Sequence, residues 1–175
     1  MQIHLAEISE CDGKTEKYSL PFEMPAVTYQ GSSYEVADST PIELTIENTG
    51  NHVLKINGKT DITVILPCDR CLEDVRTVIP LMFEQKLDMK QTAEDRIKDL
   101  DESSYLNGTD LDMDRMVYLE LLMNWPHKVL CKEDCKGLCA TCGKNLNFGK
   151  CGCKEEPKDP RMAAISDIFS KFKEV

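Results

Sequence analysis

Hydrophobic and polar residues alternate along the first half of the chain. In residues 42–47, isoleucine and leucine occupy every second position between glutamate and threonine. A period of two is typical of a strand with one buried face. The same alternation recurs in residues 3–8, 18–22, 53–56 and 62–66. We therefore predict an antiparallel β-rich domain over residues 1–87, built as a meander or a partly open barrel.

Turn residues separate these segments. Gln-Gly-Ser-Ser at 30–33 and Asn-Thr-Gly-Asn at 48–51 are both rich in residues that favour tight turns. Asn57-Gly58 is the strongest short hairpin signal in the chain, because both residues tolerate the positive φ that two-residue hairpin loops require. We expect a turn at Asn57-Gly58 between the strand at 53–56 and the strand at 62–66.

The next segments continue the sheet and then leave it. Residues 75–79 are rich in β-branched side chains and favour another strand, with Pro80 marking an edge or a bulge. Residues 88–112 are acidic and show little apolar periodicity, so we predict a solvated connector.

Two helices are predicted beyond the connector. Asp112 is a good N-cap for an apolar-faced helix over residues 113–125, which we expect to pack on the sheet until Pro126 stops it. Residues 159–175 begin with Asp-Pro and carry apolar residues on one face, which predicts a short amphipathic helix that packs on the sheet or docks on a partner. The fold class is α+β.

The strongest chemical signal is the cysteine-rich segment at 126–158. It contains four cysteines with the spacing C-x2-C-x8-C-x-C: Cys139, Cys142, Cys151 and Cys153. Two closely spaced pairs can supply the four thiolates of a tetrahedral zinc ion, and a site closed by four thiolates is structural because no position remains for water or substrate. Free or disulfide-bonded cysteines are the alternative.

A second zinc site requires residues far apart in the chain. Cys68 and Cys71 lie in a strand-to-strand loop, and Cys131 and Cys135 are the thiols left to complete a set of four. Loop closure costs grow only logarithmically with length, whereas structural zinc contributes on the order of 10 kcal/mol. The Cys68–Cys71 pair alone also fits an unmetallated turn or a redox pair. Cys11 stands apart as an ordinary thiol.

Charge and hydropathy limit the classes of function that the chain can have. The formal net charge of −10 disfavours a whole-surface attraction to nucleic acid. Residues 127–158 are the basic part, with 7 basic and 4 acidic side chains. A zinc held by four thiolates carries about −2 and removes most of that excess. With no long apolar run and no basic, apolar leader at the start, we expect a cytoplasmic protein without a membrane segment.

Several motifs together resemble one family. They are Cys68-Asp-Arg-Cys71-Leu72, Leu121-Leu-Met-Asn-Trp125-Pro126, Leu130-Cys131, Asp134-Cys-Lys-Gly-Leu-Cys139, Cys142-Gly-Lys-Asn-Leu-Asn147 and Asp159-Pro-Arg161. In this order they resemble the bacterial YceD family, the large ribosomal RNA subunit accumulation proteins. The resemblance runs from about residue 40 to the end of the chain. It implies a non-enzymatic role in accumulation of the large-subunit ribosomal RNA during ribosome assembly.

We therefore expect a zinc-binding factor and no enzyme, because the three histidines and the remaining polar residues form no catalytic motif. The expected partner is a ribosomal or ribosome-assembly protein, with pre-ribosomal RNA as a further candidate and no small-molecule substrate. Two alternatives stay open. One is a zinc-stabilised protein-interaction adaptor unrelated to ribosomes, and the other is a thiol redox or metal sensor.

Overall fold

The computed structural model describes residues 1–91, residue 95 and residues 104–153. Its strands are β1 (Gln2–His4), β2 (Thr15–Leu20), β3 (Ala26–Tyr29), β4 (Ser32–Ser39), β5 (Ile42–Asn48), β6 (Val53–Pro67), β7 (Asp74–Asp88), β8 (Leu106–Asn107) and β9 (Asp110–Asp112). Its helices are α1 (Ala6–Glu10), α3 (Met113–Met123) and the 3-10 helix η1 (Leu146–Phe148). None of the described helices is both long and apolar enough to cross a bilayer.

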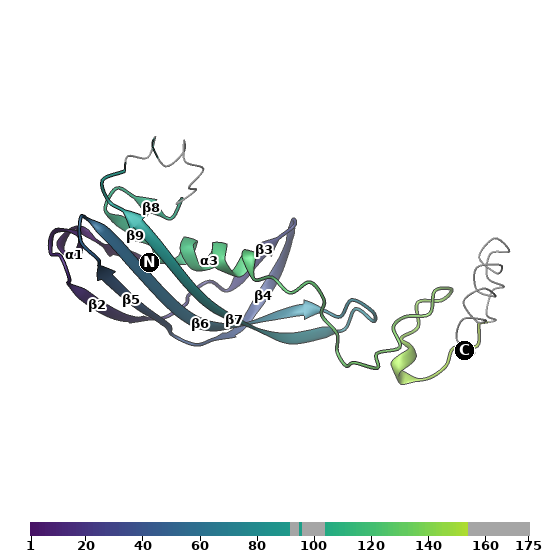
Figure 1. Ribbon diagram of the computed structural model, residues 1–175. Helices are drawn as coiled ribbons and strands as arrows, with labels where there is room; N and C mark the ends of the chain where they lie inside the picture. The colour runs from purple at the N-terminus through teal and green to yellow at the C-terminus, as the bar shows by residue number, and fades with distance from the viewer. Residues whose placement is uncertain (92–94, 96–103, 154–175) are drawn as a thin grey trace, which may run out of the picture.

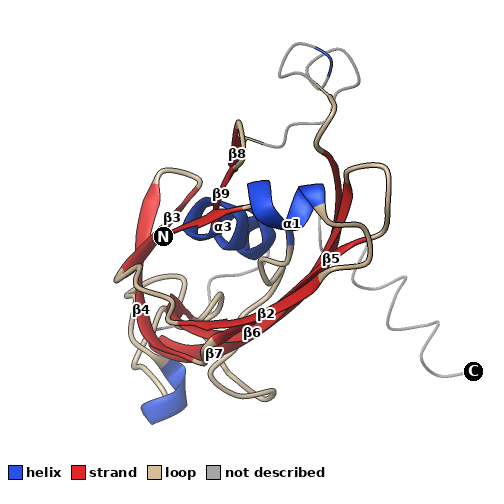
Figure 2. Ribbon diagram, turned by 90° about the vertical axis from the view of Figure 1, so that its left-hand side faces the viewer, coloured by secondary structure: helices blue, strands red, loops and turns tan. Residues whose placement is uncertain are grey.

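The main sheet is antiparallel, and β6 is its central strand. On one side β6 pairs with β7 over the whole length of both strands, from Val53 opposite Asp88 to Pro67 opposite Asp74. On the other side it pairs first with β5 and then with β4. Figure 2 shows the sheet curving around the helices without closing. The predicted α+β class and the antiparallel sheet are confirmed, and the sheet is open and does not close into a barrel.

The hydrophobic core lies in the concave face of this sheet. In β5, β6 and β7 the buried residues fall on alternate positions, as the alternation predicts. Helix α3 covers this face with Met113, Met116, Val117 and Leu121, and the side chain of Gln85 on β7 donates a 3.0 Å hydrogen bond to Glu120 of the helix. The sheet and the helix therefore share one core (Figure 1).

The hairpin predicted at Asn57-Gly58 is wrong, because both residues lie inside the uninterrupted strand β6. Gly58 faces Phe83 of β7, and a Cβ built on this glycine would lie 2.1 Å from the Cζ atom of that ring. The glycine leaves room for an aromatic ring on the neighbouring strand. The turn that joins β5 to β6 uses the other predicted signal, with Asn51 and His52 at φ of 57° and 63°.

The N-terminal segment also differs from the prediction. Residues 2–4 form β1 as expected, but Ile8 lies in helix α1 and packs into the core from there. The amide of Asn48 donates to the carbonyls of Ile8 and Ser9 at 2.8 and 3.0 Å, which fixes the helix against the end of β5. Alternation over so few residues does not distinguish a strand from one helical turn.

The described part of the stretch 88–112 contains two strands where the sequence predicts a connector. β9 pairs with both β1 and β8, so that this stretch brings the N-terminus of the chain into a second, three-stranded sheet. The predicted helix at 159–175 lies outside the described residues.

Helix α3 begins and ends near the predicted positions. The side chain of Asp112 accepts a hydrogen bond from the backbone N–H of Arg115, as an N-cap does. After the helix, the ring of Trp125 stacks on Tyr29 at a centroid distance of 4.6 Å and lies 5.3 Å from Tyr34. These contacts hold the outgoing chain on the hairpin formed by β3 and β4.

We expect Gly58→Ala to destabilise the fold by about 1 kcal/mol, because overpacking against Phe83 costs about 1–3 kcal/mol and outweighs the about 0.5–1 kcal/mol by which alanine is otherwise favoured over glycine in a strand. Urea unfolding of both proteins measures this difference. The same substitution in a Phe83→Leu background is the control and should cost less. Equal or greater stability of the single variant would contradict the packing argument.

Candidate metal centres

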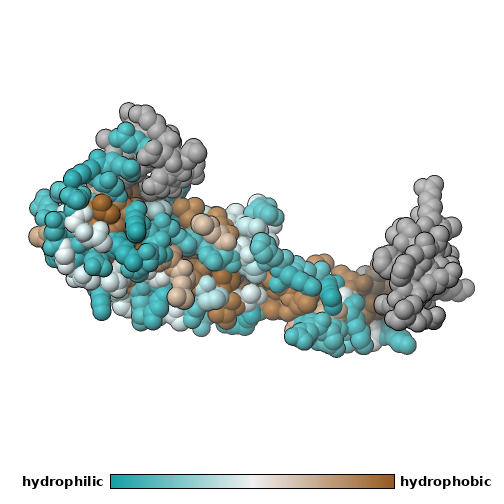
Figure 3. All heavy atoms as spheres, in the orientation of Figure 1, coloured by the Kyte–Doolittle hydropathy of each residue, from teal (hydrophilic) through white to brown (hydrophobic). Residues whose placement is uncertain are grey.

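Two groups of four cysteines gather in the described residues, and they are the two groups that the sequence predicts. We call Cys68, Cys71, Cys131 and Cys135 the proximal cluster, and Cys139, Cys142, Cys151 and Cys153 the distal cluster. The proximal cluster lies at the end of the β6–β7 hairpin and the distal cluster lies beyond it (Figure 1). We call residues 127–153, which run outward from this hairpin, the extension. In Figure 3, hydrophobic residues gather where this extension leaves the sheet.

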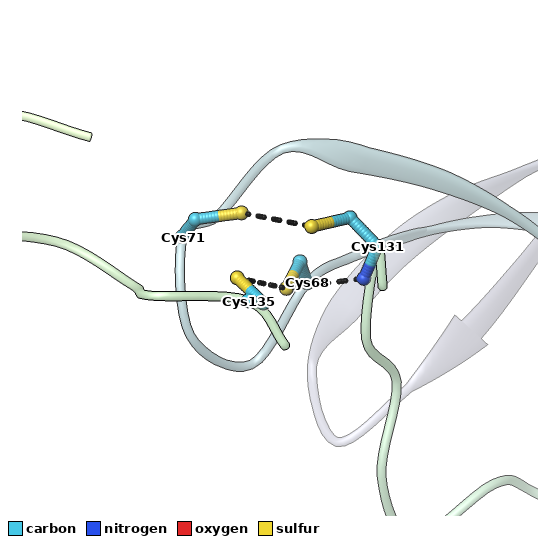
Figure 4. Close-up of side chains that lie close together, drawn as sticks. All are labelled: Cys68, Cys71, Cys131 and Cys135. Carbon is cyan, nitrogen blue, oxygen red and sulfur yellow. Dashed lines mark hydrogen bonds between the residues drawn. The ribbon is translucent and has the colours of Figure 1, made fainter. Parts of the chain in front are cut away.

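The proximal cluster joins the hairpin loop to a segment some sixty residues further along the chain. Figure 4 shows its four side chains pointing toward one another, two from the loop and two from the returning segment. The sulfur atoms of Cys68 and Cys135 lie 3.8 Å apart, and those of Cys71 and Cys131 lie 3.5 Å apart. Four sulfurs placed about 2.3 Å from a tetrahedral zinc ion are about 3.8 Å apart. The spacing of the thiols therefore fits a tetrahedral ion.

Backbone pairing positions the returning segment against the loop. Asp69 in the loop binds Val129 twice: its N–H donates to the Val129 carbonyl at 2.9 Å, and its carboxylate accepts from the Val129 N–H at 2.7 Å. The Arg70 guanidinium donates to the carbonyl of Cys135 at 2.8 Å, and the Arg70 carbonyl accepts from the N–H of Leu138. These bonds place Cys131 and Cys135 opposite the loop.

A side chain at Gly137 would crowd the hairpin loop. This glycine has a φ of +73°, and a Cβ on it would lie 3.0 Å from the Arg70 carbonyl oxygen. Only glycine adopts this conformation readily, so the Gly-Leu-Cys motif after Cys135 has a physical reason.

Asn147 connects the two clusters. Its side-chain amide donates to the sulfur of Cys135 at 3.3 Å, while its side-chain oxygen accepts from the backbone N–H of Lys136 at 2.9 Å. Hydrogen bonds to a ligand's sulfur hold it in place and stabilise the thiolate. Asn147 and Asp69 were not among the predicted site residues. Both lie within the family motifs Cys68-Asp-Arg-Cys71 and Cys142-Gly-Lys-Asn-Leu-Asn147, which are the signal that could have found them.

The distal cluster is local and more exposed. Its four cysteines come from residues 139–153, and the thiol of Cys151 donates to the sulfur of Cys139 at 3.3 Å. The N–H of Gly143 donates to the Cys139 carbonyl at 2.9 Å and closes the turn between the first two cysteines. Cys142 is exposed, whereas three of the four proximal cysteines are buried. The distal thiols are thus the more accessible to solvent.

The proximal thiols have opposite pKa shifts. Burial opposes ionisation of Cys68, but the backbone N–H groups of Arg70, Cys131 and Cys71 outweigh it and lower the pKa of Cys68 to about 6. The Asn147 amide lowers the pKa of Cys135. Burial, with the neighbouring thiols, raises the pKa of Cys131 to about 12. Near neutral pH the cluster therefore holds both thiolates and thiols until a cation displaces the remaining protons.

The distal thiols show the same division. The backbone N–H of Cys142, together with that of Thr141, lowers the pKa of Cys139 to about 6. The thiol group of Cys142, followed by burial, raises the pKa of Cys153 to about 12. Each cluster therefore presents at least one thiolate to an arriving metal ion.

All nine cysteines are free thiols in the structure. The sulfur atoms within each cluster are 3.3 to 3.8 Å apart where they contact one another, well beyond the about 2.05 Å of a disulfide. Cys11 is exposed and belongs to neither cluster. What the geometry can do is hold one metal ion in each group of four thiols.

Comparison with known proteins identifies the family. The sequence model described as "Large ribosomal RNA subunit accumulation protein YceD" matches residues 56–169, which is more than half of the chain. The chain belongs to the YceD family. The match includes every cysteine of the proximal and distal clusters and begins within strand β6 of the main sheet.

Three curated relatives are similar at low identity. An uncharacterized protein of Mycobacterium tuberculosis is 25% identical over 128 residues, covering 73% of this chain and 61% of the relative. The chloroplastic large ribosomal RNA subunit accumulation protein YCED homolog 1 of Arabidopsis thaliana is 23% identical over 165 residues, covering 78% and 51%. An uncharacterized protein of Mycobacterium leprae is 23% identical over 129 residues, covering 74% and 58%.

This chain spans between 51% and 61% of the length of these relatives. No solved structure matches it. The comparisons therefore establish the YceD family and identify neither a metal nor a mechanism.

We expect the protein to bind two Zn²⁺ per chain, and Cys68→Ser and Cys139→Ser to bind one each. Each substitution removes a ligand from one cluster only, and the two clusters share no thiol. Elemental analysis of the purified proteins measures the zinc content. Cys11→Ser is the matched control and should keep both ions. Full zinc content in Cys68→Ser would show that the proximal cluster is not a ligand set.

We also expect zinc affinity to rise with pH between about 7 and 9. Cys131 and Cys153, with pKa values raised to about 12, are protonated thiols in the metal-free protein over this range. Each zinc ion must displace at least one proton, so affinity should rise about tenfold or more per pH unit at each site. Below pH 6, Cys68 and Cys139 also become protonated and the dependence should steepen. Competition with a chromophoric chelator measures the affinity, and a flat profile would contradict this assignment.

Proposed function

We propose that this protein is a non-enzymatic, zinc-binding factor that promotes accumulation of the large-subunit ribosomal RNA. Membership of the YceD family supports the ribosomal role. Thiol ligands alone, in groups of four at tetrahedral spacing, favour Zn²⁺ among the metals available to a cell. We place this role in the cytoplasm, where reducing conditions keep the thiols available.

The observation that carries the proposal is the closed form of both clusters. Each group offers four thiols whose sulfur atoms all lie within 4.8 Å of one another. A zinc ion with four thiolate ligands has no position left for water or substrate, so it shapes the protein and performs no reaction. The described histidines lie outside both groups. We infer that the protein acts by binding.

The proximal zinc would then have one structural task. It would fasten the cysteine-rich extension to the β6–β7 hairpin, because two of its ligands belong to each part. The thiols of Cys68 and Cys135 would supply thiolates, and the Asn147 amide would keep the sulfur of Cys135 oriented toward the ion. The extension thereby becomes a fixed surface that a partner can bind.

The charge of the sheet favours a basic partner on that side of the molecule. Residues 1–91 and 104–126 carry 19 acidic and 9 basic side chains. These acidic side chains repel the phosphates of nucleic acid, whereas ribosomal proteins that bind RNA are rich in lysine and arginine. We propose that the protein binds such a protein, or pre-ribosomal RNA associated with it, during assembly of the large subunit.

Deletion of the gene should lower the ratio of large-subunit to small-subunit ribosomal RNA in the native host. The wild-type gene should restore this ratio, and a Cys68→Ser/Cys135→Ser gene should not, because the extension loses its attachment. Electrophoresis of total RNA measures the ratio, with Cys11→Ser as the control that restores it. An unchanged ratio in the deletion strain would overturn the proposed function. Full rescue by the double variant would overturn the structural task of the zinc.

A further inference from the structure

The outer end of the extension combines three lysines with one exposed aromatic ring. Lys136, Lys144, Lys150 and Phe148 are all exposed. Phe148 has 76% of its surface accessible, and it is the one aromatic residue among the large hydrophobic side chains that are exposed in the described residues. Exposed single hydrophobic residues are ordinary, so the ring becomes informative only through its surroundings.

The distal cluster and the 3-10 helix η1 position these four side chains. Lys144 lies just after the Cys139–Cys142 turn, and its Nζ donates to the carbonyl of Lys150 at 3.2 Å, so the two ends of the loop lie together. Phe148 is the last residue of η1, between these two lysines in the chain. The ring and the two lysines therefore share one small loop.

Lys136 reaches the same loop through Asn147. Its backbone N–H donates to the side-chain oxygen of Asn147, the residue next to Phe148, at 2.9 Å. The N–H of Leu146 also donates to the carbonyl of Gly137 at 2.9 Å. The chain around Lys136 is thus held against the aromatic end of the loop.

Charge separates this loop from the rest of the molecule. Residues 136–153 contain three lysines and no acidic residue. A divalent ion held by four thiolates leaves about −2 at the cluster, so the outer end keeps a net charge of about +1. Residues 1–91 and 104–126 carry ten more acidic than basic side chains. A polyanion would be repelled by the sheet and would approach the outer end.

We propose that residues 136–150 bind single-stranded RNA, with Phe148 stacking on a base and the three lysines contacting neighbouring phosphates. The choice of RNA rests on the proposed function. Stacking on an exposed aromatic residue requires an unpaired base, whereas phosphate contacts alone do not distinguish single strands from duplexes. Because the net charge is small, stacking supplies much of the affinity and the dependence on salt is shallow.

The experiment measures binding of the full-length, zinc-loaded protein to a fluorescent 12-nucleotide single-stranded RNA of mixed sequence by anisotropy. Phe148→Ala should weaken binding about tenfold, as loss of one stacked base does. Replacing all three lysines with glutamine should reduce the slope of log K against log salt by about 2, since each phosphate contact on a single strand contributes about 0.7. Zinc content should stay at two per chain in both variants.

Matched controls lie on the sheet and on α3. Met123→Ala removes another hydrophobic side chain, 79% exposed, and Lys17→Gln removes an exposed lysine of β2. Both should bind the RNA as the wild type does. The proposal would be overturned if Phe148→Ala bound the RNA as tightly as wild type does, or if the protein bound the same sequence more tightly as a duplex. It would also be overturned if the protein bound a 12-residue polyglutamate peptide and Phe148→Ala weakened that binding as much as it weakens RNA binding. The last result would indicate a site for acidic proteins instead.

Failure of this inference is distinguishable from failure of the proposed function. If the deletion strain has a lowered ratio of large-subunit to small-subunit RNA, and Phe148→Ala fully restores this ratio while binding RNA as well as wild type does, RNA binding at this loop is overturned and the ribosomal role stands. If the ratio of ribosomal RNAs is unchanged in the deletion strain and purified protein still loses RNA binding in Phe148→Ala, the ribosomal role is overturned and the RNA site stands.

Discussion

The convergence of four sulfur atoms at the end of one hairpin is the constraint on which the rest of the extension depends. Beyond residue 126, the described chain is held by a few backbone bonds to the hairpin loop, by the side chains of Asp69 and Arg70, by the buried side chain of Val129 and by the proximal thiols. A single such hydrogen bond contributes about 1 kcal/mol, whereas a structural zinc ion contributes about 10–16 kcal/mol in small zinc domains. A metal at this point would therefore outweigh any one of these hydrogen bonds.

Local pattern predicted most of the sheet, and each of its errors has a physical cause. The alternation in residues 42–47 predicted the buried face of β5 correctly, because a strand with one solvent-exposed face has apolar side chains at every second position. The turn predicted at Asn57-Gly58 was wrong because this glycine makes room for Phe83, a residue on the next strand and twenty-five positions away. The strand predicted to reach Ile8 was wrong because α1 is too short for a helical period to appear in the sequence.

For the candidate site, too, the sequence predicted one part and not another. The spacing of the distal cysteines is a property of fifteen consecutive residues, so the sequence was enough to group them. The proximal group followed only from counting the thiols that remained. The contacts of Asp69 and Asn147 could not be predicted, since they depend on which backbone groups the fold brings beside them. Trp125 belongs to a recognisable motif, yet its stacking partners come from the β3–β4 hairpin.

Asn147 couples the outer loop to the proximal cluster. Its side chain belongs to the outer loop, but the sulfur that it contacts belongs to the proximal group. Oxidation of Cys135 would remove this sulfur contact, while the bonds from the Lys136 N–H to Asn147 and from the Leu146 N–H to Gly137 would still hold the outer loop. Damage to the exposed outer thiols would leave the Asp69–Val129 pairing untouched. Because Asn147 lies between Cys142 and Cys151, however, such damage would also disturb its contact with Cys135, so that one side chain makes each cluster sensitive to the state of the other.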